Sequence, residues 1–108
     1  DALAARAERH GNVAAVIASL EGWDPAGLKS VASAIAARPG HVAILFGAPA
    51  PSPVVIVRAP DADFDCAAAL ARLTGAFGGK GGGRPDLAQG GGLQGTPDAL
   101  EKFARALF

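Results

Sequence analysis

The chain has 108 residues, and its ten Lys and Arg balance its ten Asp and Glu, so the formal net charge at pH 7 is zero. Half of the residues are hydrophobic, which excludes a disordered chain and predicts one domain with a core of its own. Zero net charge excludes a surface that is basic all over, so any binding of nucleic acid must be confined to a local site.

The first predicted elements are the end of a helix and a buried strand. Residues 1–10 match the last turns of a helix, and Gly11 is suited to end it. We therefore expect residues 1–11 to be the end of a linking helix that continues from a longer partner. Residues 13–20 form a nearly continuous apolar run of strand length, which is typical of a strand covered on both faces.

A helix and a second strand follow. Asp24 can accept hydrogen bonds from the first amides of a helix, and Pro25 is preset for the first helical position. Apolar residues then recur at helical spacing as far as Ile35, and the sequence at 38–40, Arg-Pro-Gly, ends the helix. Residues 42–46 read as the next strand. Strand, helix and strand in this order predict a right-handed parallel crossover.

The next connection sets the sheet type. Only seven residues, three of them proline, separate the strand at 42–46 from the apolar run at 54–57. This connection is too short to carry a helix across a sheet, so the two strands are predicted to be antiparallel neighbours. The predicted fold class is therefore α/β: a single domain in which helices flank a mixed β-sheet.

Two more helices complete the predicted fold. Asp61, Asp63 and Asp65 are carboxylates suited to the positive end of a helix, and apolar residues from 66 to 77 then share one helical face. Thr96 and the Pro-Asp pair after it open a last helix, which carries a second apolar stripe.

The segment from Gly75 to Gly95 holds ten of the chain's fifteen glycines. Because packed elements are predicted on both sides of it, we expect a glycine-rich loop at 75–95 inside a globular domain that spans residues 12–108. Long glycine-rich loops inside compact domains usually carry function.

The residues of this loop point to anion binding. Glycines let backbone amides approach a phosphate or a carboxylate closely. Lys80 and Arg84 add positive charge, and Asp86 is placed either to orient the guanidinium of Arg84 or to cap the turn made by Pro85. A magnesium–nucleotide loop fits poorly, because Gly81 stands where that motif needs Ser or Thr.

A dinucleotide-binding motif also fits poorly. Gly90, Gly92 and Gly95 have the required spacing before a helix. The chain ends at Phe108, however, so no acidic residue follows at the distance of about 20 residues that this motif needs.

Residues 78–92 read GGKGGGRPDLAQGGG, and this segment resembles the signature of the DHHA1 domain, in the form that closes alanyl-tRNA synthetases and long alanyl-tRNA editing proteins. The order of predicted elements agrees over about the whole chain. The positions that match the family's motif are Gly79, Lys80, Gly81, Gly82, Gly83, Arg84, Pro85, Asp86, Ala88, Gln89 and Gly91.

The resemblance implies a DHHA1-like module that binds the outer corner, or elbow, of alanine-specific tRNA. We expect it to position tRNA by contacts to the RNA backbone, as a fragment of an alanine–tRNA ligase or an alanyl-tRNA deacylase. The synthetase's ATP site and the zinc ligands of the editing domain are absent from the sequence, so the chain is not expected to be catalytic by itself. The candidate nucleic-acid-binding residues are Lys80, Gly81, Gly82, Gly83, Arg84, Asp86 and Gln89.

Two alternative functions stay open. In related DHH phosphoesterases this domain holds nucleotides or single-stranded nucleic acid, and a His of the glycine motif meets the substrate phosphate; Arg84 stands in that place here. The other alternative is a mainly structural role, in which the domain self-associates through the helix predicted at residues 1–10.

The glycine-loop residues also admit a structural interpretation. Arg84 can satisfy loop carbonyls or pair with Asp86 instead of binding RNA, and the two roles are compatible. The glycines at 81–83 can be required for close packing as well as for ligand contact.

Four other side chains are expected to have ordinary structural roles. Cys66 is predicted to be a buried packing thiol rather than a reactive one. Trp23 is predicted to pack at the start of a helix, with RNA contact as the alternative if it is exposed near the glycine loop. Arg58 and Arg72 are predicted to be solvated surface residues, with enlargement of a basic patch as the alternative.

No metal or other cofactor is expected, because the single Cys and two His lack the paired short spacings of a zinc site. No apolar run approaches the roughly 20 residues of a membrane span, so no membrane contact is expected. A single Cys suits a reducing compartment, and we expect a cytoplasmic protein.

Overall fold

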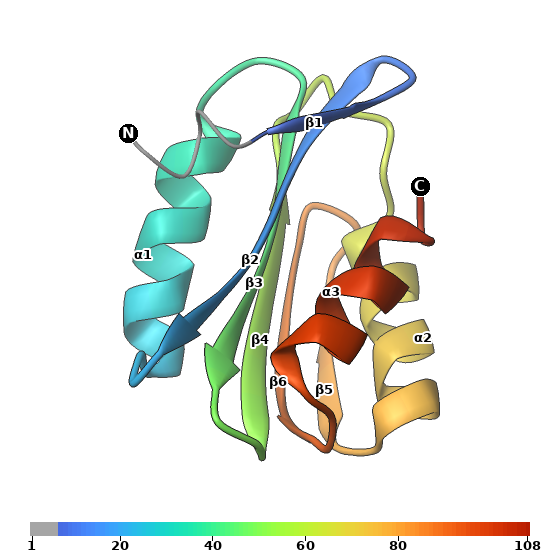
Figure 1. Cartoon of the computed structure of the whole chain (residues 1–108). Coiled ribbons are helices and arrows are strands. Elements are labelled where there is room, and N and C mark those ends of the chain that lie inside the picture. The colour runs from blue at the N-terminus through green and yellow to red at the C-terminus, as the bar shows by residue number, and fades with distance from the viewer. Residues whose placement is uncertain (1–6) are drawn as a thin grey trace.

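The computed structural model describes residues 7–108, which form a six-stranded sheet with helices on both faces. Helix α1 covers one face, and α2 and α3 cover the other (Figure 1). The strand order is β1-β2-β3-β4-β6-β5. The elements are β1 (Glu8–His10), β2 (Val13–Glu21), α1 (Pro25–Ala36), β3 (His41–Ala48), β4 (Ser52–Arg58), α2 (Cys66–Phe77), β5 (Lys80–Gly83), β6 (Leu87–Leu93) and α3 (Pro97–Arg105).

The predicted α/β fold class and the mixed β-sheet are confirmed. Strands β2 and β3 are parallel, with Ile17 opposite Ile44, and the chain between them forms α1. Strands β3 and β4 are antiparallel, with Ile44 opposite Ile56. The proline-rich connection between them is a tight turn, as its length requires.

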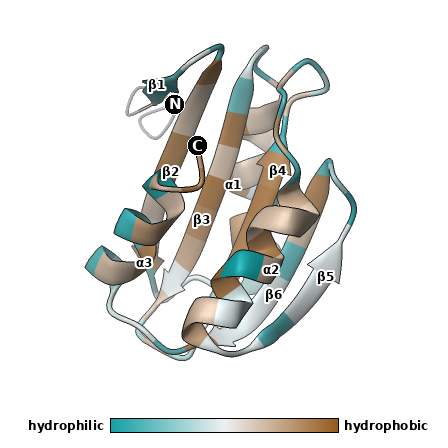
Figure 2. Ribbon diagram, turned by 90° about the vertical axis from the view of Figure 1, so that its right-hand side faces the viewer, coloured by the Kyte–Doolittle hydropathy of each residue, from teal (hydrophilic) through white to brown (hydrophobic). Residues whose placement is uncertain are grey.

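The central strands are buried on both faces, which explains their continuous apolar sequence. Alternate residues point to opposite sides of the sheet. Phe46 and Ile56 belong to the core under α2 and α3, whereas Leu45 and Val55 belong to a second core under α1. Figure 2 shows that strands β2–β4 are largely hydrophobic (brown), whereas the edge strand β5 is pale.

Side-chain caps start all three helices at the predicted positions. Asp24 Oδ1 accepts from the amide of Gly27 at 2.8 Å, Asp65 Oδ1 from Ala68 at 3.0 Å, and Thr96 Oγ1 from Ala99 at 3.1 Å. Asp61 does not serve the helix after it. Its Oδ1 accepts from the amide of Gly40 at 2.8 Å and so ties two loops together.

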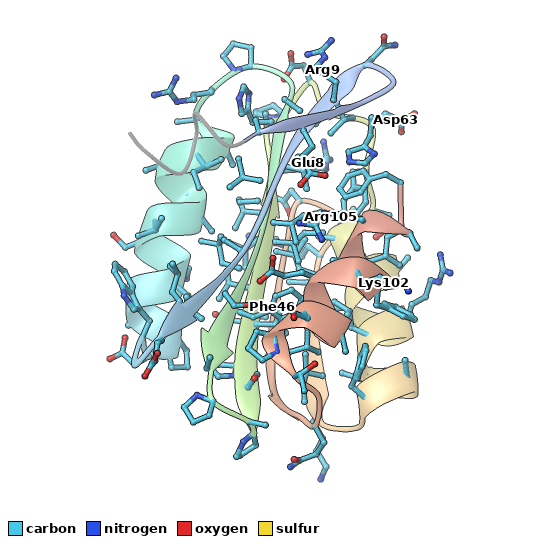
Figure 3. The ribbon with its side chains drawn as sticks, in the orientation of Figure 1. Glu8, Arg9, Phe46, Asp63, Lys102 and Arg105 are labelled. Carbon is cyan, nitrogen blue, oxygen red and sulfur yellow. The ribbon has the colours of Figure 1, made fainter. Side chains whose placement is uncertain are left out.

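The helix predicted for the N-terminal residues is wrong where the structure describes it. Glu8–His10 form β1, which pairs antiparallel with β2 through a tight turn at Gly11, where φ is 65°. Pairing with the edge of β2 outweighs the local preference for helix, and an ion pair joins Glu8 to Arg105 of α3 (Figure 3). Residues 1–6 of the predicted helix lie outside the described residues.

The glycine-rich loop predicted at 75–95 is also wrong as a continuous loop. Gly75 lies inside α2, and two antiparallel strands, β5 and β6, occupy most of the segment. Strand β6 pairs with β4 and so extends the sheet into this segment, although glycine by itself does not favour a strand.

No helix among residues 7–108 is long and apolar enough to cross a membrane.

Candidate nucleic-acid interface

The glycine segment forms a hairpin at the edge of the sheet. Strand β6 pairs with β4 on one side and with β5 on the other, and β5 is the last strand. Residues 84–86 connect β5 to β6, and the amide of Arg84 donates to the carbonyl of Leu87 at 2.8 Å. We call residues 80–93 the glycine hairpin.

One face of the glycine hairpin lies against α2 and has no room for a side chain at Gly81 or Gly83. A Cβ on Gly81 would lie 2.6 Å from the Cα of Gly90 and 2.9 Å from Cδ2 of Leu70 on α2. A Cβ on Gly83 would lie 2.5 Å from the Cα of Ala88. Glycine is therefore required at positions 81 and 83 for close packing of backbone on backbone, as the structural interpretation of these residues proposed.

The opposite face of the glycine hairpin is open. Leu87 packs into the core under α1, so Gln89, two residues along the strand, lies on that same side of the sheet. Helix α1 packs on β3 and β4 and leaves this part uncovered. A Cβ on Gly82, the partner of Gln89, would meet no atom within 4 Å. We call this surface the open face: Lys80, Gly82, Gln89 and Gly91.

The edge of the glycine hairpin also presents backbone groups. Hydrogen-bonded and non-hydrogen-bonded pairs alternate along an antiparallel ladder. Because Arg84 is hydrogen-bonded to Leu87, the alternation directs the amides and carbonyls of Gly81 and Gly83 away from β6. All four residues of β5 are exposed, so these groups can reach a ligand.

The two cations of the glycine hairpin lie on one side of it, at the two ends of β5. Lys80 begins β5 and Arg84 follows its end, which separates their Cα atoms by about 13 Å at the usual rise of a strand. Alternation along the strand directs both side chains to the same side as Gly82. Two cations spaced in this way can contact two different phosphates of an RNA backbone.

Asp86 orients the guanidinium of Arg84, one of the two roles predicted for it. Arg84 Nε lies 3.2 Å from Asp86 Oδ1, while the side chains stay 73% and 54% exposed. An exposed ion pair contributes little to stability. Arg84 therefore keeps donors free for a ligand, and the structural and the binding role are compatible.

Arg58 is a site residue that the sequence analysis missed, since it was predicted to be solvated. Its Nε donates to the carbonyl of Pro85 at 3.1 Å, and Nη1 donates to the carbonyls of Ala59, Pro60 and Ala62 at 3.4, 3.2 and 3.1 Å. The guanidinium thus fixes the turn of the glycine hairpin against the chain that follows β4. An isolated arginine before a proline-containing loop gives no sequence signal of this role.

We expect Arg58→Met to lower the free energy of unfolding by about 1–2 kcal/mol, because several carbonyls lose a charged donor. Methionine keeps most of the length of the side chain and removes only its donors. Urea unfolding measures the loss, and Arg38→Met, at an exposed arginine after α1, is the control. Equal losses in the two variants would contradict the role of Arg58.

Cys66 is fully buried at the start of α2, as predicted for a packing thiol. Burial raises the pKa of the thiol to about 12, although the charge of Arg58 opposes this shift. The thiol therefore stays protonated at neutral pH and is a poor nucleophile.

We expect Cys66 to react with a thiol reagent at pH 8 at least about 100-fold more slowly in the native chain than in urea, because the thiolate is the reactive form. The unfolded thiol ionises near pH 9, below the native pKa of about 12. Unfolding therefore releases a proton in this range, and stability falls as pH rises from 9 to 12. Cys66→Ala should remove that part of the slope.

Trp23 and Arg72 lie outside the glycine hairpin. Trp23 is 44% exposed and lies over Gly27 in the first turn of α1. The guanidinium of Arg72 on α2 lies 6.0 Å from the ring centre of Phe103, on the side of the sheet opposite the open face.

The comparisons with known proteins agree on one family. Residues 12–108 match the DHHA1 domain. Alanine–tRNA ligases from a Nostoc species and from Trichormus variabilis are each 36% identical over 94% of this chain, and that of Nostoc punctiforme is 37% identical over 93%. The chain spans 12% of the length of each of these relatives.

A solved structure has the same fold. The crystal structure of the C-Ala domain from Aquifex aeolicus alanyl-tRNA synthetase superposes with a TM-score of 0.80 at 23% sequence identity. The match covers 94% of this chain and 96% of that domain.

Proposed function

Because the chain belongs to the DHHA1 domain family, we propose that it is a tRNA-binding C-terminal module of an alanine–tRNA ligase and that it binds the elbow of alanine-specific tRNA. The relatives that match nearly the whole chain are alanine–tRNA ligases, which supports a synthetase rather than a phosphoesterase. Arg84, in place of the phosphoesterase His, supports the same choice.

The observation that carries this proposal is the open face of the glycine hairpin. It combines backbone that a ligand can approach closely with exposed Lys80, and exposed Arg84 follows at the end of β5. RNA backbone carries one negative charge at each nucleotide, and two separated cations on one face suit a strand better than a single anion. The exposed amide of Gln89 adds a donor and an acceptor that can contact a ribose hydroxyl.

The role of the chain in this proposal is to position tRNA. Contacts to phosphates fix the orientation of an RNA without reading its sequence, and the shape of the RNA then supplies selectivity. Lys80, Arg84 and the outward amides of Gly81 and Gly83 hold the backbone in this scheme. The ligation reaction is assigned to the part of the parent enzyme outside this chain.

A binding titration tests the proposal. The ligands are an alanine tRNA transcript, an acceptor-stem hairpin without the elbow, and a mononucleotide, each at two salt concentrations. We expect salt-sensitive binding of the whole tRNA and at least about tenfold weaker binding of the hairpin. Preference for the mononucleotide would favour the phosphoesterase alternative, and equal binding of tRNA and hairpin would contradict recognition of the elbow.

A further inference from the structure

A cavity lies beside the turn of the glycine hairpin, at the end of β5 and not on the open face. Its volume is about 330 Å³. Two of its walls belong to the turn between β5 and β6, and the other two belong to the end of β4 and the chain after it. We call it the turn cavity, and its lining residues are Arg58, Pro60, Pro85 and Asp86.

Arg58 places a fixed cation in the wall of the turn cavity. Its Nε and Nη1 donate to four backbone carbonyls, which hold the half-buried side chain in one orientation. A guanidinium carries five N–H donors, of which two are on Nη2. These two have no hydrogen-bond partner among residues 7–108, and Arg58 forms no ion pair with a carboxylate of that range. The charge of Arg58 is therefore free to attract an anion.

The free donors of Arg58 lie beside the turn of the glycine hairpin. Nη2 shares one edge of the planar guanidinium with Nε, and Nε donates to the carbonyl of Pro85 at 3.1 Å. The planar donors of arginine match the oxygens of a phosphate. Because the side chain is already held by protein carbonyls, it loses little conformational entropy when it binds a ligand.

Two carboxylates close to the turn cavity already have partners. Asp86 Oδ1 lies 3.2 Å from Nε of Arg84. Asp65 accepts from an amide in the first turn of α2, where the positive end of the helix dipole opposes its charge. The remaining walls are proline rings, which carry no charge. The donors of Arg58 are therefore the groups of this cavity that an anion can use.

We propose that the turn cavity binds a phosphate of the RNA and that Arg58 donates to it through Nη2. This inference rests on the proposed function, in which Arg84 contacts another phosphate of the same strand. Asp86 links the two positions, because its carboxylate pairs with Arg84 and also lines the turn cavity. The RNA backbone thus follows the glycine hairpin around its turn. Arg58 fixes that turn and extends the contact with RNA beyond the open face.

A double-variant cycle separates contact with RNA from support of the turn. If Arg58 contacts its own phosphate, Arg58→Met should weaken tRNA binding about 5–10-fold and lower the slope of log K against log salt concentration by about 0.7–0.9. Both losses should persist when Arg84 is already alanine. Arg38→Met, at an exposed arginine after α1, should change neither quantity. Losses that vanish in the Arg84→Ala chain would overturn the proposal, because Arg58 would then act only by placing Arg84.

NMR of the unaltered chain tests the turn cavity without any substitution. The side-chain Nε–H signal of Arg58 is followed during titration with inorganic phosphate and with alanine tRNA, and chloride at equal ionic strength is the control. We expect saturable shifts with phosphate and with tRNA, and no shift of the Arg72 signal from α2.

The outcomes of this titration separate the possible sources of phosphate. An Arg58 signal that responds to neither ligand would overturn the proposal. A response to free phosphate, together with unchanged tRNA binding by Arg58→Met, would overturn the assignment to RNA. The variants of Lys80 and Arg84 are measured separately, so failure of the turn cavity is distinguishable from failure of the open face to bind RNA.

Discussion

Replacing Gly81 by alanine is expected to lower the free energy of unfolding by about 2–3 kcal/mol, close to the upper limit for overpacking. The added Cβ would lie 2.6 Å from the Cα of Gly90 and 2.7 Å from the carbonyl oxygen of Gln89. Both atoms belong to the backbone of β6, which pairing with β4 holds in place. Strand β5 must therefore move away from β6, and the side chain of Leu70 on α2 blocks one direction.

Gly82→Ala is the matched control, because it makes the same substitution one residue further along the same strand. A Cβ at position 82 meets no atom within 4 Å, and the backbone there has no positive φ. Alanine restricts the unfolded chain more than glycine does, so this variant should be neutral or up to about 1 kcal/mol more stable. Urea unfolding with unchanged m values measures both variants. Equal destabilisation of the two would contradict the packing assigned to the α2 side of the glycine hairpin.

This pair of variants also separates folding from function, which the sequence by itself left ambiguous for the three glycines. Positions 81 and 83 face α2, whereas position 82 is on the open face. A Gly82 variant that folds normally and loses RNA affinity therefore reports on binding. The distinction depends on strand alternation, and no pattern within a run of three identical residues reveals it.

The central strands and the helix starts could be predicted from the sequence because each has a local cause. Residues 13–20 and 42–46 are continuous apolar runs, and burial on both faces follows directly from them. Asp24, Asp65 and Thr96 cap their helices by contacts that span three residues, so sequence spacing is sufficient to find them.

The strands at the two edges of the sheet could not be predicted, because their cause is not local. Residues 80–83 contain no residue that favours a strand, and they become one only because β6 offers a free edge. Glu8–His10 likewise become a strand by pairing with β2. The same reasoning applies to the candidate site: Lys80 and Arg84 were predicted in one loop, and the extended strand separates them.

The double variant Lys80→Ala, Arg84→Ala is expected to weaken binding of alanine tRNA by about 3 kcal/mol, or about 100-fold in Kd. Each cation faces the open side of the glycine hairpin and has little burial to lose, so removal should leave stability nearly unchanged. The Cα atoms of the two residues are about 13 Å apart along β5. If each cation contacts its own phosphate, the two single variants should lose similar amounts of affinity that add.

The dependence on salt makes this expectation specific. Each lost phosphate contact should reduce the slope of log K against log salt concentration by about 0.7–0.9, so the double variant should lose about 1.4–1.8. Lys102→Ala removes an equal charge from the exposed face of α3, on the other side of the sheet (Figure 3), and should leave the slope unchanged. If Lys102→Ala lowers affinity and slope as much as either variant in the glycine hairpin, tRNA responds only to net charge. The open face would then have no special part in binding. A local site loses affinity only when its own cations are removed, whereas a diffuse electrostatic attraction weakens when any surface cation is removed.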